Sequence, residues 1–219
     1  MNDLIYFPLK RLIDIVGSII LIVVFLPIWI ILPILIKLES GGPIFYTPDR
    51  VGRFGKDFKM YKFRSMKMIE VGGKEVHAVE FWKYNKKLYH KYRKAGWKLT
   101  LEEDPRITKL GKILRQTSVD EFPQLLNILR GDMSLVGPRT IVEPEIRDAI
   151  KQYGSTIEPL ITESLSVKPG LTGPWQVSGR NKIPWDQRVA MGAEYARRKN
   201  LLDDIAIIIK TPFAMISKW

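Results

Sequence analysis

Two adjacent carboxylates, Asp120 and Glu121, follow Arg115 in the segment Arg115-Gln-Thr-Ser-Val-Asp-Glu121 of a chain that is otherwise rich in cations. On spacing alone, Ser118 and Glu121 fit a capping box at the start of a helix, with each side chain bonding the other's backbone amide. The chemical alternative is a nucleophile, because a carboxylate beside Mg²⁺ and phosphate can form an acyl phosphate. The spacing favours the cap, and the basic surroundings favour the chemistry.

Cations that could hold a phosphate occur along the chain. Arg115 comes just before the carboxylates, and Gly131-Asp-Met-Ser-Leu-Val-Gly-Pro-Arg139 ends in a rigid turn that could present Arg139 to a phosphate or a nucleotide. A constrained Gly/Pro-rich loop adds Gln176 and Arg180.

An expected strand at 58–64 carries two further cations. Side chains alternate along a strand, so Lys62 and Arg64 would share the face opposite Tyr61 and Phe63. Two cations aimed the same way could hold phosphate, and a solvated strand face explains them equally well.

Composition excludes several classes of chemistry. The 219 residues include no Cys and two His, so disulfides, thiolate zinc sites and a Cys nucleophile are excluded, and a histidine metal site has little material. Dinucleotide-binding, Walker, HExxH and GxSxG motifs are absent. The net charge of +12 indicates an anionic partner: nucleic acid, a membrane surface or a phosphorylated substrate.

Residues 15–36 form an uncharged apolar run of the kind that normally predicts a membrane helix. Pro27 at its centre predicts a kink or a break, and the half from 12 to 26 makes about 22 Å of helix, too short to cross a bilayer core of about 30 Å. Basic residues flank both ends, beginning with Lys10 and Arg11, which suits a segment that enters and leaves by one face. We expect a re-entrant helix; a straight span is the main alternative, ahead of a cleaved signal peptide or a buried soluble helix.

The remaining sequence predicts short strands followed by helices. Strands are expected at 44–46 and 58–64 around a turn at 52–56, with helices within 104–115, from Ser118 to a stop at Gly131, at 184–199 and at 201–217, and a loop at 166–182. The last helix would gather Leu201, Ile205, Ile208, Ile209 and Phe213 on one side.

Residues 81–98 are basic and aromatic without an acid, which is typical of a helix at a membrane interface. Nucleic-acid binding or an ordinary solvated helix remain alternatives, and the neighbouring apolar run favours the interface.

Seven segments together resemble the bacterial sugar transferases, the monotopic phosphoglycosyl transferases that begin glycan assembly on polyprenyl phosphate. In family order, they are Lys10-Arg-Leu-Ile-Asp14, the apolar run with Pro27, Tyr61-Lys-Phe-Arg-Ser-Met66, Arg115-Gln-Thr-Ser-Val-Asp-Glu-Phe-Pro-Gln124, Gly131-Asp-Met-Ser-Leu-Val-Gly-Pro-Arg139, Lys168-Pro-Gly-Leu-Thr-Gly173 and Trp175-Gln-Val-Ser-Gly-Arg-Asn181. One such segment would be weak, whereas the ordered set is specific.

The resemblance implies a two-step transfer. Asp120 would attack the sugar-bearing phosphate of a UDP-sugar and expel UMP, and undecaprenyl phosphate would then take the phosphosugar from Asp120. Mg²⁺ would lie near Asp120, with Glu121 helping to position the metal or to handle the proton. Pro138 and Arg139 would bind the nucleotide, although Thr140 stands where the family usually has a second proline.

The resemblance and the residues together predict an α+β, mainly helical fold with an N-terminal re-entrant, Pro-broken membrane helix, a small β-hairpin and amphipathic interfacial helices. Residues 1–40 would be the membrane anchor and 41–219 the catalytic domain on the cytoplasmic face of the bacterial inner membrane. The expected substrate-binding set is Lys62, Arg64, Arg115, Pro138, Arg139, Gln176 and Arg180, and the membrane set is Lys10, Arg11 and Pro27.

The expected partners are a UDP-sugar, undecaprenyl phosphate and the membrane, without nucleic acid, and a homo-oligomer is left open. Trp175-Gln-Val-Ser-Gly-Arg180 is more similar to the galactose branch, so UDP-galactose or UDP-glucose is the expected donor. The competing class is a non-enzymatic, membrane-anchored basic binding protein.

Overall fold

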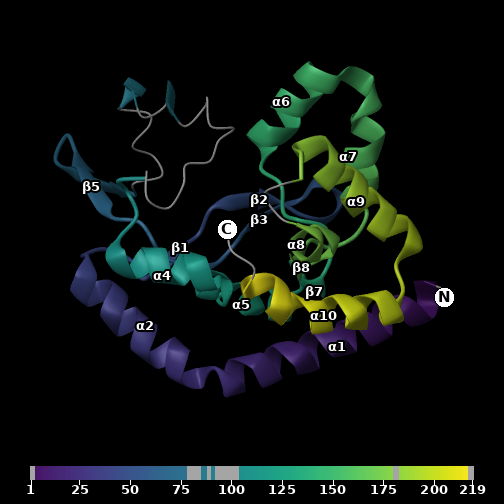
Figure 1. The fold of residues 1–219 in the computed structure, drawn as a ribbon, viewed down its shortest axis with the longest axis horizontal. Helices are drawn as coiled ribbons and strands as arrows, with labels where there is room; N and C mark the ends of the chain where they lie inside the picture. Colours follow the sequence, from purple (N-terminus) through teal and green to yellow (C-terminus); the bar gives the residue numbers. More distant parts are fainter. Residues whose placement is uncertain (1–2, 78–84, 88–89, 92–103, 180–182, 217–219) are drawn as a thin grey trace. The chain divides into compact units, whose positions relative to one another are not determined.

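The computed structural model describes residues 3–77, 85–87, 90–91, 104–179 and 183–216 (Figure 1). Most of the helix expected at 81–98 and Arg180 lie outside them. The described part is mainly helical with short two-stranded sheets, as predicted. The chain divides into unit 1 (Met1–Phe25, Thr47–Tyr61 and Glu121–Trp219) and unit 2 (Leu26–Tyr46 and Lys62–Asp120), and each is described by itself.

The apolar run forms two helices, α1 (Asp3–Val24) and α2 (Leu26–Glu39), with a bend of 63° at the break between them. Pro27 lies in the first turn of α2, where its ring and missing N–H would disrupt the bond to the Val23 carbonyl of a continuous helix. The break therefore falls at Phe25, confirming the prediction of one near Pro27. No single helix in the described part is long and apolar enough to cross a membrane, whereas the bent pair together meets that test by length and composition.

In unit 1, α1 buries a polar stripe. Its buried residues, Tyr6, Lys10, Asp14 and Ser18, follow one another at intervals of four and so share one face. Most of the exposed large side chains of the helix are apolar: Leu4, Ile5, Leu9, Leu12, Val16, Ile19, Ile20, Val23 and Val24. A surface helix of a water-soluble domain has the opposite arrangement.

The polar stripe of α1 packs on strand β7 (Ser134–Val136), which pairs in parallel with β8 (Gly170–Thr172). Asp14 accepts hydrogen bonds from the Leu135 amide at 2.8 Å and from the Ser134 hydroxyl at 2.9 Å. The acidic residue within the hydrophobic segment therefore docks the helix onto the sheet.

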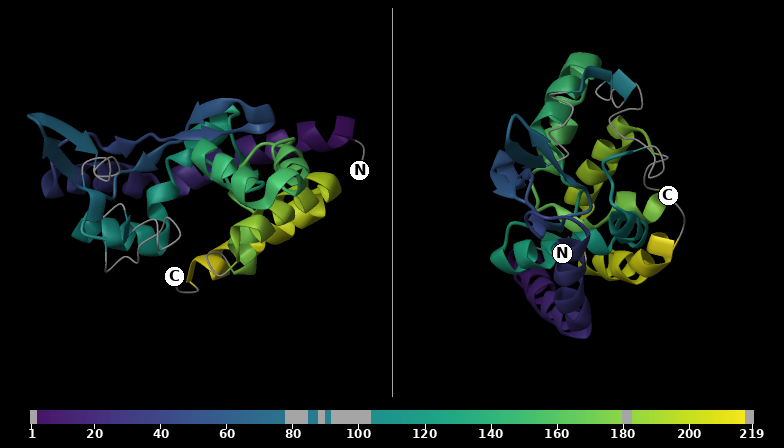
Figure 2. Two further views of the ribbon diagram at one scale, coloured as in Figure 1. Left: turned by 90° about the horizontal axis from the view of Figure 1, so that it is seen from above. Right: turned by 90° about the vertical axis from the view of Figure 1, so that its left-hand side faces the viewer.

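The rest of unit 1 comprises a hairpin and a helical layer. The hairpin joins β2 (Asp49–Val51) to β3 (Asp57–Lys59), with the predicted turn between them. The helices are α5 (Gln124–Arg130), α6 (Glu143–Tyr153), α7 (Glu158–Ser164), α8 (Pro174–Ser178), α9 (Trp185–Arg198) and α10 (Leu201–Ile216). Helices α7 and α9 pack together (Figure 2) around a buried cluster of Ile141, Ile157, Ile161 and Val189. Helix α6 adds the partly buried Ile146 and Ile150 to this cluster.

Two expectations for unit 1 are corrected. The segment 166–182, predicted as a loop, contains β8 and α8, because β8 gains its hydrogen bonds from the distant β7. The strand predicted at 58–64 is two strands, of which only β3 belongs to unit 1.

Unit 2 contains α2, α4 (Lys109–Thr117) and two small antiparallel sheets. In one sheet β1 (Phe45–Tyr46) pairs with β4 (Lys62–Phe63); in the other β5 (Met68–Val71) pairs with β6 (Lys74–His77). Thr108 caps α4, with its hydroxyl oxygen accepting from the Gly111 amide at 2.8 Å.

Gly111 lets α4 approach the backbone that follows β4. A Cβ at this position would lie 2.0 Å from the Ser65 carbonyl oxygen, a backbone atom that cannot rotate away. We expect Gly111→Ala to lower the free energy of unfolding by about 1–3 kcal/mol, despite the better helix propensity of alanine. Denaturant unfolding would measure this, with Gly41→Ala as the matched control, since the described residues leave open space around an added Cβ there. Equal stability of both variants would contradict the close approach.

The predicted division into residues 1–40 and 41–219 concerns a membrane and stays a prediction. The two compact units follow different boundaries, because α1 belongs to unit 1 and α2 to unit 2.

Candidate active site

The predicted catalytic pair lies in a short turn between two helices. Ser118 ends α4 in the left-handed conformation, with φ of 57°, and its N–H bonds to the carbonyls of Arg115 and Leu114. A 3-10 turn, η3 (Val119–Glu121), follows, and α5 begins after Pro123. The predicted capping box is therefore wrong, since Ser118 closes one helix and does not open the next. The predicted stop at Gly131 is confirmed, with φ of 94°.

Asp120 is 7 % exposed, and Glu121 is partly buried. Asp120 is the last residue of unit 2, and Glu121 opens the last segment of unit 1. The turn between α4 and α5 therefore carries both carboxylates, and one of them is almost fully buried.

In unit 2 the predicted cations are held by neighbouring polar groups. Arg115 donates from Nε to the Ser65 hydroxyl at 2.8 Å. Arg64, which is 2 % exposed, donates from Nη2 to the Ser40 carbonyl at 2.7 Å, just past the end of α2. Lys62 is half-buried in β4. Arg64 thus fastens the end of α2, a structural contact that the sequence did not reveal.

His77 reports a positive potential in the same unit. Its ring stacks on Tyr46 at a centroid distance of 4.3 Å. Burial, followed by the positive charges of Arg64, Arg115 and Arg106, lowers the pKa of His77 to about 4. Three guanidinium charges therefore act on this partly buried ring.

The pH dependence of stability tests this potential. The unfolded state takes up a proton on His77 near its ordinary pKa of 6.5, whereas the folded state resists it until about 4. The stability that His77 contributes is therefore complete above pH 6.5 and is lost as the pH falls toward 4. We expect His77→Gln to remove this component of the pH profile of unfolding, and His90→Gln, at an exposed histidine, to leave it. Parallel profiles for the wild type and His77→Gln would contradict the assignment.

In unit 1 the predicted nucleotide-binding turn is anchored to β8. The Pro138 carbonyl accepts from the Gly170 amide at 2.9 Å. Arg139 pairs with Glu145 at 3.3 Å, and its guanidinium lies 5.2 Å from the centroid of the Trp175 ring. These contacts hold Arg139 in a defined place, and its predicted role toward a nucleotide stays a prediction.

Arg188 on α9 was missed by the sequence analysis. Its guanidinium lies 5.3 Å from the centroid of the Trp175 ring. Burial and then the charge of Arg139 lower the pKa of Arg188. Two guanidinium groups therefore lie at one indole ring, and Arg188 also donates from Nε to the Ile183 carbonyl at 2.7 Å. Gln176 donates weakly to the Leu171 carbonyl at 3.4 Å.

Lys10 and Arg11, predicted to face the membrane, make protein contacts within unit 1. Lys10 forms an ion pair with Asp204 at 3.1 Å. Arg11 donates from Nη1 and Nη2 to the carbonyls of Ile128 at 2.5 Å and Leu129 at 2.7 Å. Their predicted role toward lipid headgroups stays a prediction.

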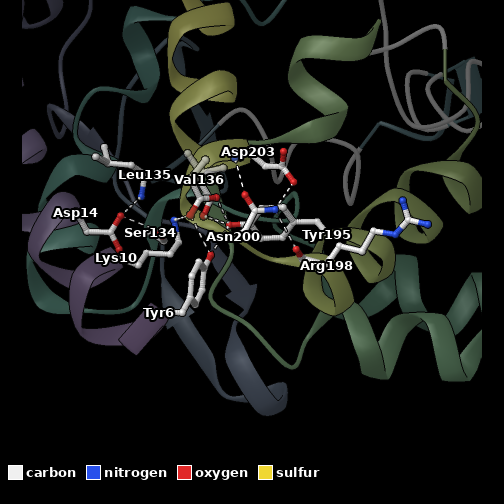
Figure 3. A network of polar contacts seen from close by, with 11 residues as sticks. Tyr6, Lys10, Asp14, Ser134, Leu135, Val136, Tyr195, Arg198, Asn200 and Asp203 are labelled. Atoms are coloured by element: carbon white, nitrogen blue, oxygen red, sulfur yellow. Dashed lines mark hydrogen bonds and ion pairs between the residues drawn. The ribbon is translucent and has the colours of Figure 1, made fainter. Parts of the chain in front are cut away.

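Asp204 of α10 is the centre of a buried network, and Figure 3 labels its partners Tyr6, Lys10 and Tyr195. It accepts from the Tyr6 hydroxyl at 2.9 Å and from the Tyr195 hydroxyl at 2.6 Å, besides its ion pair with Lys10. Burial, followed by the charge of Asp204, raises the pKa of the Tyr195 phenol, so this hydroxyl keeps the proton that it donates. The network joins α1, α9 and α10 within unit 1.

Asp120 and Glu121 are the carboxylates that the sequence predicts beside Mg²⁺. Among the residues that the structure describes, no three Asp, Glu or His side chains gather in a cluster. Mg²⁺ in phosphoryl-transfer sites commonly uses one or two carboxylates and completes its shell with substrate phosphates and water. The donor set of Asp120 and Glu121 fits that pattern.

Comparison with known proteins identifies the family. Residues 5–218 match the family described as bacterial sugar transferase. The chain is 40 % identical over 202 residues to the exopolysaccharide production protein ExoY of Sinorhizobium fredii, covering 92 % of this chain and 83 % of that protein. It is 43 % identical over 206 residues to the undecaprenyl-phosphate galactose phosphotransferase of Salmonella typhimurium, covering 93 % of this chain and 39 % of that protein.

A third relative is the UDP-glucose:undecaprenyl-phosphate glucose-1-phosphate transferase of Escherichia coli, 35 % identical over 210 residues, which cover 94 % of this chain and 39 % of that protein. The matched residues include the carboxylate pair and the turn at Arg139. The chain therefore belongs to the bacterial sugar transferase family.

Proposed function

We propose that this enzyme transfers a sugar 1-phosphate from a UDP-sugar to undecaprenyl phosphate and releases UMP, the first step in building a polysaccharide or glycoconjugate. The observation that carries the proposal is the match over residues 5–218 to a family whose relatives include phosphotransferases named for this acceptor. The same match favours an enzyme over the non-enzymatic binding protein.

In the first step a carboxylate oxygen of Asp120 attacks the phosphorus that bears the sugar. The bond from that phosphorus to the bridging oxygen breaks, and UMP leaves with this oxygen and the electron pair. In the second step a phosphate oxygen of undecaprenyl phosphate attacks the same phosphorus. The bond to Asp120 breaks, which restores the carboxylate and yields undecaprenyl diphosphate sugar.

Other charged residues of the chain would bind the metal ion and the phosphate groups of this reaction. Glu121, together with Asp120, would hold Mg²⁺, which when bound neutralises phosphate charge. Arg139, oriented by Glu145 and Trp175, would bind the nucleotide diphosphate. In unit 2, Lys62 and Arg115 would bind a phosphate, and the guanidinium charges of Arg115, Arg64 and Arg106 that add to the effect of burial on the pKa of His77 support this.

The exposed apolar surfaces support membrane association. The exposed large side chains of α1 are mostly apolar, α2 exposes apolar side chains up to the charged Lys37 and Glu39 at its end, and α10 exposes Leu202, Ile205, Ile209 and Phe213. The α1–α2 break suits a re-entrant anchor with both ends on the cytoplasmic face. A tag at either terminus should then be accessible only from the cytoplasm, and a periplasmic N-terminus would contradict this topology.

UDP-galactose is the first donor to test. Three relatives are named for galactose, and another for glucose 1-phosphate transfer. Both sugars agree with the expectation from the segment that begins at Trp175.

The decisive experiment measures UMP release from a panel of UDP-sugars with undecaprenyl phosphate and Mg²⁺. We expect release with one donor or a few, in proportion to the lipid product. Without acceptor, labelled UMP should still exchange into the UDP-sugar, since the first step is complete in itself. No UMP release from any donor would reject the function, and release without exchange would reject the covalent route.

A further inference from the structure

The residue at the break between α1 and α2 contacts the chain directly after the carboxylate pair. The Phe25 ring lies 5.0 Å from the Phe122 ring, centroid to centroid, at an interplanar angle of 62°. This edge-to-face geometry is one that aromatic pairs prefer. Phe122 follows Glu121 in the sequence, so the contact fixes the point at which the turn leaves the carboxylates.

Helix α1, which ends just before Phe25, contacts the C-terminal end of α5. Arg11 of α1 donates to the carbonyls of Ile128 and Leu129, which lie in the last turn of α5. A guanidinium is favourable there, because the last carbonyls of a helix lack partners within the helix and carry partial negative charge. Within unit 1, α1 and the residue that follows it, Phe25, therefore contact the segment 122–129 at both ends.

In unit 2, taken by itself, α2 likewise contacts a helix next to the carboxylate turn. Glu39, the last residue of α2, accepts from the Leu110 amide at 2.9 Å, in the first turn of α4. A carboxylate is favourable at this end of a helix. Thus α1 contacts the helix that follows the carboxylates, and α2 contacts the helix that precedes them.

We propose that Phe25 is a positioning residue for the turn that carries the carboxylates, and that its contact with Phe122 within unit 1 fixes the place of Glu121 and of the chain that follows it. Val24 and Leu26, on either side, are exposed and already supply apolar surface, whereas Phe25 is partly buried against another ring. The assignment rests on the proposed function, because its effect is on the rate of UMP release.

The test compares Phe25→Ala, Phe122→Ala and the double variant, with Val24→Ala as the control for lost apolar surface. We expect Phe25→Ala to lower kcat for UMP release about tenfold, per membrane-bound enzyme, while KM for the UDP-sugar changes less than about twofold. The double variant should lose little more than the worse single variant, since both remove one contact. Phe25→Tyr keeps the ring and should recover most of kcat.

Two outcomes would overturn the inference while the proposed function stands. In the first, Phe25→Ala has the same kcat for UMP release as Val24→Ala. In the second, the fold-losses of kcat in the two single variants multiply in the double variant. A wild-type chain that releases no UMP from any donor would remove the proposed function, and this inference with it. A drop in membrane-bound protein or in melting temperature shared by Phe25→Ala and Phe25→Tyr would also count against positioning, because the ring is retained in the second variant.

Discussion

Asp120→Asn is expected to lower UMP release by at least about a thousandfold, because the amide cannot form the phosphosugar intermediate. The side chains have nearly the same shape, so the folded state should persist at this buried position. The measurement is UMP release with the best donor, accompanied by thermal unfolding. Wild-type enzyme given a sugar-labelled donor without acceptor should retain label on the protein, and the variant should not.

Asp148→Asn provides the matched control, since Asp148 is an exposed aspartate on α6. This control should keep wild-type rates and labelling. If Asp120→Asn released UMP at the wild-type rate, Asp120 would not be the nucleophile, whatever the effect on the second step.

Asp204→Asn is expected to lower the free energy of unfolding by roughly 3–5 kcal/mol, because it leaves the charge of Lys10 buried without its partner. The ion pair has side-chain exposures of 11 % for Lys10 and 2 % for Asp204. The variant also weakens two acceptor contacts, from Tyr6 and Tyr195. Denaturant unfolding in detergent micelles, followed by tryptophan fluorescence, would measure the loss.

The exposed pair of Glu194 and Arg198 gives the comparison. Glu194→Gln should cost less than about 1 kcal/mol, because solvent screens that pair. Lys10→Met combined with Asp204→Leu should recover much of the stability, since neither charge is then left alone. Equal costs for Asp204→Asn and Glu194→Gln would show that the buried network contributes little.

Local signals in the sequence predicted much of the helical fold. The last two helices, the stop at Gly131 and the turn at 52–56 follow from periodicity and from the conformational freedom of glycine, which are properties of neighbouring residues. The hairpin of β5 and β6 also had such a signal, because Gly72 and Gly73 both have positive φ and stand between alternating residues.

What the sequence could not predict depends on residues far apart in the chain. Strand β8 exists only because β7 supplies its partner, which a short window of sequence does not show. Ser118 and Glu121 have the local spacing of a cap, but Ser118 instead ends α4 and α5 begins only after Pro123.

The candidate site shows the same limit. Arg139 was predicted from its turn, whereas the second guanidinium at Trp175, that of Arg188, comes from a helix with no motif around it. Lys10 and Arg11 were predicted only as flanks of an apolar run. Their partners, Asp204 and the α5 carbonyls, lie more than a hundred residues away in the chain, so the neighbouring sequence does not show them.

The polar stripe of α1 has a practical consequence for dissecting this protein. A shortened chain that starts at residue 41 would lose Lys10, which neutralises Asp204. It would also lose Asp14, whose carboxylate accepts the hydrogen bond of the Leu135 amide. It would also uncover the side of β7 on which the helix rests. Helix α1 is thus an integral part of the folded unit 1. A water-soluble variant is better obtained by replacing the exposed apolar side chains of α1 than by deleting the helix.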